Sequence, residues 1–256
     1  AMTGLGWGTA SAVWAGVALL AVFAWFPQRK LGAHTETMEE PAEIAEPARM
    51  AEPAERKAVR SSASGSIWKS PLAWYLTLFF GMQSLNFYSL TAWLPSMLQG
   101  YGMAPDTAGY MALWFQLVGT PSSFLAPILA ARMRNQRTIV NGICISYFLG
   151  LVLLVTFHST LAVLIALFFL ANGGAASFSW IMAMFSLKSA DAGEAISLAG
   201  MSQSVGYLLA AIGPTLCGVI FDAFGAWSLV FVLFFAITAV MAAAGILASK
   251  KEKLFP

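Results

Sequence analysis

The stretch GMQSLNFYSLTAWLPSML, residues 81–98, lies within a long apolar run but carries several hydrogen-bonding side chains and no charge. At helical spacing Gln83 and Asn86 share one face, while Ser84 and Thr91 share a nearly opposite one. An amide facing lipid would lose its hydrogen bonds with water, so both faces must contact protein or a water-filled cavity. We predict that Gln83 and Asn86 face a cavity and bind a solute there. For Ser84 and Thr91 we favour hydrogen bonds to neighbouring helices, which is also the alternative for the two amides.

Neutral polar side chains recur in the other apolar runs, in MALWFQLVGTP, ANGGAASFSW and MSQSVGY. No Asp, Glu, Lys or Arg lies in the middle of any run. Intramembrane charges usually mark proton relays or ion pairs, so the pattern indicates neutral hydrogen bonding instead. His34 and His158 have no nucleophile, carboxylate or metal-ligand companion, so we expect no enzyme, metal site or cofactor. The predicted solute-binding residues are Gln83, Asn86, Gln116, Asn172, Gln203 and Tyr207.

The elements that position these residues follow from the composition. Hydrophobic residues make up 59% of the 256 residues and charged residues only 10%, against about 25% in soluble domains. Runs of about 20 apolar residues are long enough to span a bilayer as helices, which satisfy their own backbone. We therefore predict an all-α membrane protein with seven transmembrane helices, at residues 5–26, 72–98, 107–131, 138–157, 161–187, 195–221 and 227–249.

The basic residues predict the orientation of these spans in the lipid bilayer. All 14 Lys and Arg follow the first, third, fifth or seventh span. The connections at residues 99–106, 158–160 and 222–226 contain none. The positive-inside rule then places the linker after the first span and the C-terminus in the cytoplasm, and the N-terminus outside.

The chain divides into three parts. Residues 1–26 form a lone helix, and residues 27–68 a charged segment in which EPA recurs every six residues, from Glu40, Glu46 and Glu52. Proline at this interval interrupts helices, and so few apolar residues cannot offset the entropy of ordering, so we predict a flexible linker. Residues 69–256 form a six-helix bundle. The division into one helix plus six, and the start at Ala1, lead us to expect that an N-terminal half is missing, although Met2 is an alternative start.

Two motifs resemble a known family. A long linker followed by six helices resembles the C-terminal half of a major facilitator superfamily transporter, and QSLNFYSLTAWLP resembles the seventh helix of its cyanate permease-like branch. GPTLCGVIFDAFGAW, with Gly218, Asp222, Gly225 and Trp227, resembles the eleventh helix of that branch and the turn after it. The loop AARMRNQR departs from the family signature, because Ala131 occupies the position of its Asp and the second Gly is absent.

The resemblance implies a secondary transporter of the bacterial inner membrane that works by alternating access between two six-helix bundles. It also implies that the first, second, fourth and fifth helices of this bundle line the cavity. The expected cargo is a small molecule, either a small anion or a small polar organic solute, and no nucleic acid. A truncated product without transport activity is one alternative. A seven-helix receptor or retinal protein is another, which the absence of a lysine from residues 227–249 and the long linker disfavour.

Overall fold

The computed structural model describes residues 15–16, 19–20, 67–133 and 135–249. The chain separates into two compact units, Ala1–Arg56 and Lys57–Pro256. In the first unit the four described residues are helical. The predicted lone helix at residues 1–26 otherwise lies outside the described residues, as does the predicted linker except for Ile67 and Trp68. Ile67 is already buried in the core of the second unit.

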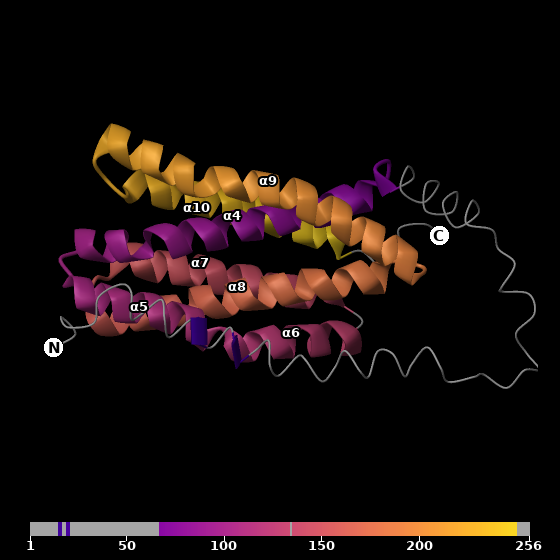
Figure 1. Cartoon of the computed structure of the whole chain (residues 1–256), viewed down its shortest axis with the longest axis horizontal. Helices are drawn as coiled ribbons and strands as arrows, with labels where there is room; N and C mark the ends of the chain where they lie inside the picture. The colour runs from indigo at the N-terminus through magenta and orange to yellow at the C-terminus, as the bar shows by residue number, and fades with distance from the viewer. Residues whose placement is uncertain (1–14, 17–18, 21–66, 134, 250–256) are drawn as a thin grey trace, which may run out of the picture. The chain divides into compact units, whose positions relative to one another are not determined.

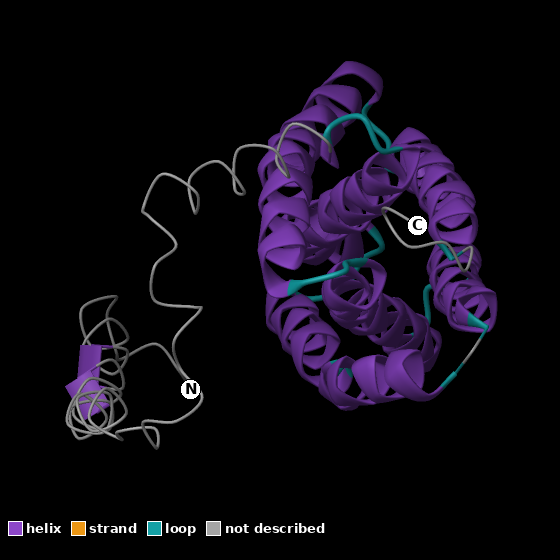
Figure 2. Ribbon diagram, turned by 90° about the vertical axis from the view of Figure 1, so that its right-hand side faces the viewer, coloured by secondary structure: helices purple, strands orange, loops and turns teal. Residues whose placement is uncertain are grey.

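The described part of the second unit is helical, and its helices run alongside one another (Figure 1). Figure 2 shows the same helices end-on, joined by short loops. In chain order they are α4 (Pro71–Gly100), α5 (Pro105–Val118), α6 (Thr120–Arg132), α7 (Gln136–Thr156), α8 (Thr160–Lys188), α9 (Ala192–Phe224) and α10 (Ser228–Ala248).

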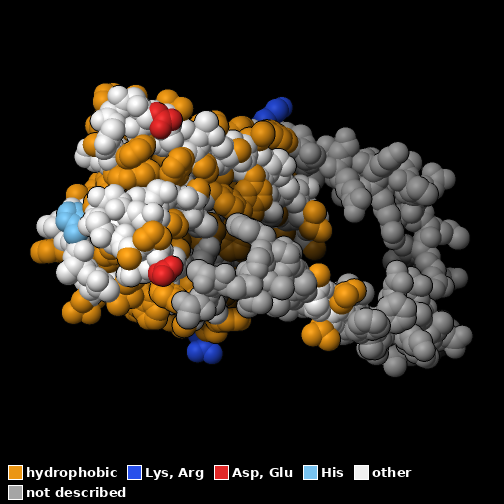
Figure 3. Space-filling model, turned by 60° about the vertical axis from the view of Figure 1, so that its left-hand side comes forward, with side chains coloured by type: hydrophobic (Ala, Val, Ile, Leu, Met, Phe, Trp, Pro, Cys, Tyr) orange, Lys and Arg blue, Asp and Glu red, His pale blue; other side chains and the backbone are white. Residues whose placement is uncertain are grey.

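Five segments of this unit are long and apolar enough to cross a membrane: Pro105–Arg132, which comprises α5 and α6, and the helices α7, α8, α9 and α10. Hydrophobic side chains are prominent on the flank of the molecule shown in Figure 3, where charged ones are few. These findings confirm an all-helical membrane protein. The number of seven spans stays a prediction, because α4 does not meet the same criterion and residues 5–26 are mostly outside the described part.

The helix ends follow local sequence signals. α4 begins with Pro71, whose missing N–H costs nothing in the first turn of a helix. α9 begins with a reciprocal cap: the Glu194 amide donates to the Asp191 carboxylate at 2.8 Å, and the Ala190 amide donates to the Glu194 carboxylate. α9 ends at Gly225, which has a φ of 65° in the left-handed region that favours glycine.

The predicted span at residues 107–131 corresponds to α5 and α6, which follow one another through Gly119. Pro121 explains the interruption, because its ring and missing N–H disturb the preceding helical turn. Gly119 also lies very close to α8: a Cβ atom on it would be 2.6 Å from the Ala171 carbonyl oxygen. The interruption and the close approach occur at the same point, so α5 and α6 meet beside the middle of α8.

α4 has a central place in the bundle, in contact with α5, α8, α9 and α10. It crosses α9 where Gly81 and Gly206 adjoin, so closely that a Cβ on Gly81 would be 3.3 Å from the Gly206 Cα. At one end of the bundle the Gln136 amide donates to the Ala130 and Met133 carbonyls and accepts from the indole of buried Trp180 at 3.0 Å. These contacts tie α6, α7 and α8 together at that end.

Candidate functional site

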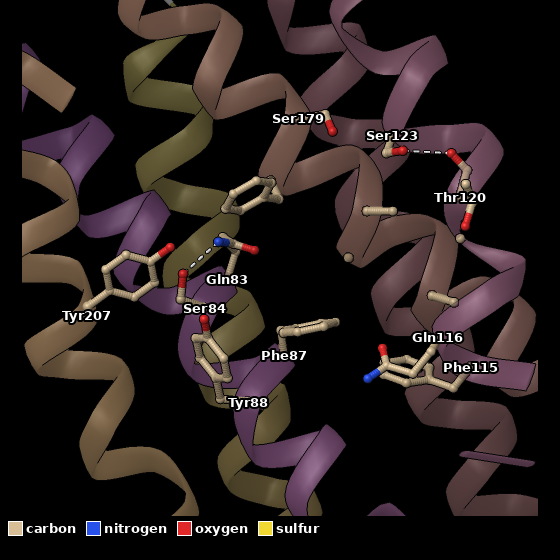
Figure 4. Close-up of a pocket in the computed structure, with 15 residues that line it drawn as sticks. Gln83, Ser84, Phe87, Tyr88, Phe115, Gln116, Thr120, Ser123, Ser179 and Tyr207 are labelled. Carbon is tan, nitrogen blue, oxygen red and sulfur yellow. Dashed lines mark hydrogen bonds between the residues drawn. The ribbon is translucent and has the colours of Figure 1, made fainter. Parts of the chain in front are cut away.

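A cavity of about 370 Å³ lies among α4, α5, α6, α8 and α9 (Figure 4). Its lining consists of small, aromatic and neutral polar side chains. These are Gln83, Ser84, Phe87 and Tyr88 of α4, Phe115 and Gln116 of α5, Thr120 and Ser123 of α6, Ala171, Gly174, Ala175, Phe178 and Ser179 of α8, Tyr207 of α9, and Gly119 between α5 and α6. None of these residues carries a charge, so the cavity offers hydrogen bonds and aromatic surface.

The α4 side of the cavity is built around Gln83. Its amide nitrogen donates to the Ser84 hydroxyl at 2.6 Å (Figure 4), and its carbonyl accepts from the Ser177 hydroxyl at 3.4 Å. An amide nitrogen carries two hydrogens, so one has no partner among the described residues after the bond to Ser84. Ser84 lines the cavity with Gln83, although the helical pattern favoured a contact with another helix for it.

The opposite side comes from the junction of α5 and α6. Gln116 is exposed to the cavity and has no hydrogen-bond partner for its amide among the described residues. Seven residues later, on α6, the Ser123 hydroxyl donates to the Thr120 carbonyl at 2.7 Å. The interruption at Gly119 therefore places polar groups of both helices on the cavity. Facing lipid instead, these groups would have no hydrogen-bond partners.

Aromatic rings complete the lining. The rings of Phe87 and Phe115 stack with centroids 6.1 Å apart and an angle of 28° between their planes. Tyr88 and Tyr207 approach each other across α4 and α9, with centroids 6.2 Å apart. Phe178 projects from α8. The cavity is thus surrounded by ring faces and edges from four helices.

The structure places three of the six predicted residues on this cavity and three elsewhere. Gln83, Gln116 and Tyr207 line it. Asn86 is buried between α4 and α10, where its amide donates to the Thr238 hydroxyl at 3.0 Å. Three residues turn a helix by about 300°, which leaves Asn86 roughly 60° away from the direction of Gln83. This rotation is enough to move Asn86 to a different neighbour.

Asn172 and Gln203 also lie away from the cavity lining. The Asn172 amide donates to the Phe168 carbonyl at 2.7 Å, and its oxygen accepts from the Ser122 hydroxyl, which joins α8 to α6. Gln203 is half-buried on α9. The residues that sequence reasoning missed are mainly aromatic. Phe87 lies four residues after Gln83, a spacing that puts both on one helical face, but phenylalanine is so common in this chain that the signal is weak.

The chain is similar to known membrane transporters. A model of the Major Facilitator Superfamily matches residues 1–211. The chain is 37% identical to "Uncharacterized transporter YycB" of Bacillus subtilis (strain 168), over 98% of this chain and 57% of that protein. It is 32% identical to the 2-nitroimidazole transporter of Escherichia coli (strain K12), over 99% of this chain and 59% of that protein. The cyanate transport protein CynX of the same strain is more distant, at 25% identity over 84% of the chain and 50% of that protein.

These matches confirm the predicted superfamily, whereas the cyanate permease-like branch is supported only by the distant similarity to CynX. The chain spans slightly more than half the length of the first two relatives. What those relatives do as whole proteins therefore applies to this chain only as a hypothesis.

Proposed function

The chain belongs to the Major Facilitator Superfamily, and we propose that it takes part in moving a small polar organic solute across a membrane by alternating access. The family and the matched relatives are transporters and not enzymes. The observation that carries the proposal is the cavity among α4, α5, α6, α8 and α9, where neutral polar groups project from segments otherwise suited to lipid.

A second helical bundle would complete the transport pathway. Several side chains that line the cavity remain exposed in the described unit, among them Gln116, Tyr88 and Tyr207. We propose that an N-terminal bundle covers this side, and that the solute is held between the two bundles near the middle of the membrane. The length of the relatives is consistent with such an arrangement.

The proposed topology has seven spans in this chain. α4 would cross the membrane as well, because its polar side chains Gln83, Ser84 and Asn86 are buried against protein or on the cavity and do not face lipid. The described basic residues support the orientation: Lys69, Arg132, Arg137 and Lys188 stand at the start of α4, the end of α6, the start of α7 and the end of α8. Because the spans alternate in direction, these four ends meet on one side, which we assign to the cytoplasm of a bacterial inner membrane.

Within the cavity we propose that Gln83, Gln116 and Tyr207 contact the solute. For Asn86 and Asn172 we propose a role in joining helices, since both bond residues of a neighbouring helix. One relative is named for 2-nitroimidazole and another for cyanate. The uncharged lining favours a neutral solute over an anion, because an anion in this cavity would have no cationic partner among the residues that line it.

Because the proposed pathway needs a second bundle, transport is tested by reconstituting the chain into lipid vesicles together with the N-terminal half of a full-length relative, and measuring uptake of radiolabelled 2-nitroimidazole and cyanate. Vesicles that contain the chain should accumulate one of these solutes faster than empty vesicles. The same uptake should saturate with concentration, because it requires a binding site. Uptake equal to that of empty vesicles, from correctly folded protein, would contradict the proposal for this chain.

A further inference from the structure

Three aromatic side chains group together on the lining of the cavity. Tyr88, Phe178 and Tyr207 are 45%, 42% and 39% exposed, and all three line the cavity beside Gln83 and Ser84. They come from α4, α8 and α9, so no single helix accounts for their grouping; Figure 4 labels Tyr88 and Tyr207. Aromatic rings pack favourably against other rings, offset or edge to face, so these three side chains can hold the flat ring of a solute.

The polar groups of the cavity lie beside these rings and are neutral. The Gln116 amide has no partner among the described residues, the Gln83 amide retains one hydrogen, and the Ser179 hydroxyl lines the same cavity. Together they offer both donors and acceptors to the edge of a bound molecule. A carboxylate or an inorganic anion would find no positive charge among the residues that line the cavity.

The size of the cavity restricts the solute further. About 370 Å³ is near the lower end of the range of roughly 300–1,000 Å³ that ligand pockets occupy. The stacked pair Phe87 and Phe115 forms one wall, and the close approach of Gly119 to α8 restricts the cavity behind the polar groups. A molecule of one or two rings matches this space.

We infer that the site takes a flat, uncharged aromatic or heteroaromatic solute, whose ring packs against Phe178, Tyr88 and Tyr207 while its polar edge bonds Gln83 and Gln116. This inference rests on the proposed transport function, because it names the class of cargo for the same cavity. It selects against small inorganic anions, which would leave the rings uncovered, and against saturated rings, which lack a flat face for stacking.

A matched pair of probes tests the ring requirement with the full chain purified into lipid nanodiscs. Benzamide and cyclohexanecarboxamide carry the same neutral amide, but only benzamide is flat and aromatic. Benzoate and cyanate supply the charged comparisons. Isothermal titration calorimetry should show the tightest binding for benzamide, weaker binding for cyclohexanecarboxamide, and the weakest for the two anions.

Two phenylalanines of α8 provide matched variants. Phe178 lines the cavity, whereas Phe168 is 45% exposed on the same helix and is not part of the lining. Phe178→Leu should lower the affinity for benzamide by roughly two- to tenfold and leave that for cyclohexanecarboxamide nearly unchanged. Phe168→Leu should change neither. A general loss of structure in Phe178→Leu would weaken the binding of both probes equally. The ratio of the affinities for benzamide and cyclohexanecarboxamide would then stay the same.

Other results would overturn the inference. Equal binding of the two amides, preference for cyanate or benzoate, absence of benzamide binding, or an unchanged affinity ratio in Phe178→Leu would each contradict an aromatic cargo. The uptake assay tests the proposed transport function separately from the inference about the class of solute. Saturable uptake of cyanate without binding of benzamide leaves transport standing and removes the aromatic class. Binding of benzamide without uptake of any solute would support the aromatic class and contradict the transport function.

Discussion

The amide of Asn86 donates to the hydroxyl of Thr238 at 3.0 Å, and this bond joins α4 to α10 in the buried core. Thr238 in turn donates to the Phe234 carbonyl at 2.8 Å within α10. The helical pattern of the sequence predicted a solute contact for Asn86; in the structure Asn86 lies outside the cavity lining and joins two helices through this bond. Such links between membrane helices contribute about 0.6–2 kcal/mol.

We therefore expect Thr238→Val to lower the free energy of unfolding by about 0.6–2 kcal/mol, because the Asn86 amide then loses its partner in the core. Asn86→Leu should have a similar effect, and the double variant should lose less than the sum of the two. Thermal unfolding in detergent measures all three. Thr215→Val, at an exposed site on α9, is the matched control and should be neutral. Additive losses of unfolding free energy would contradict the coupling between Asn86 and Thr238. A change in solute affinity with unchanged stability would support a solute contact for Asn86.

Gln116 and Gln203 allow the same substitution to be compared at a residue that lines the cavity and at one that does not. Gln116→Leu removes an amide that faces the cavity without a partner among the described residues, so solute affinity should fall two- to tenfold, the value of one hydrogen bond. Stability should stay within about 0.5 kcal/mol of the parent, since no bond within the described unit is lost. Gln203→Leu should leave affinity unchanged, because Gln203 does not line the cavity. Equal loss of affinity in both variants would show that the lining extends beyond the residues assigned here.

The junction of α5 and α6 is tested by two glycines. In Gly119→Ala the new Cβ would be 2.6 Å from the Ala171 carbonyl oxygen, so α8 and the junction must separate. We expect a loss of about 1–3 kcal/mol in unfolding free energy and weaker solute binding, because Gly119 lines the cavity. Gly109→Ala, on α5 with open space around it, should instead be neutral or stabilising by up to about 1 kcal/mol. Denaturant titration distinguishes the two, and a tolerated Gly119→Ala would mean that the junction adapts.

The orientation is tested by cysteine labelling from outside intact cells with a membrane-impermeant maleimide. Ala104→Cys and Ala226→Cys should label, because both sites are exposed in loops that lack basic residues. Arg137→Cys, exposed at the start of α7, should not label until the membrane is opened. The neighbouring Gln136 is a less suitable position for the cysteine than Arg137, because its side chain bonds Trp180 and two backbone carbonyls. The free cysteines Cys144 and Cys217 are buried and should give little background. Labelling of Arg137→Cys alone would reverse the proposed topology.

The sequence by itself was sufficient for the class of protein and for several of its helices, although residues 107–131, predicted as one span, form the two helices α5 and α6. Apolar runs such as residues 138–157 and 161–187 predicted α7 and α8 within a residue or two, because a membrane helix needs a fixed length of apolar chain. The polar pattern also predicted that neutral amides face a cavity; Gln83 and Gln116 line one, and their contact with a solute stays a prediction. Hydrocarbon cannot satisfy an amide, so this requirement is visible in the residue types alone.

Only the tertiary structure decided which polar residue meets which neighbour. Gln83 and Asn86 are three positions apart, yet one lines the cavity and the other bonds Thr238, more than 150 positions later in the chain. Ser84 lines the cavity beside Gln83, because α8 and α9 leave space at that point. Helical spacing gives the direction of a side chain relative to its own axis. What lies in that direction depends on how α4 is rotated against α9 and α10, and this rotation is set by close contacts such as Gly81 with Gly206.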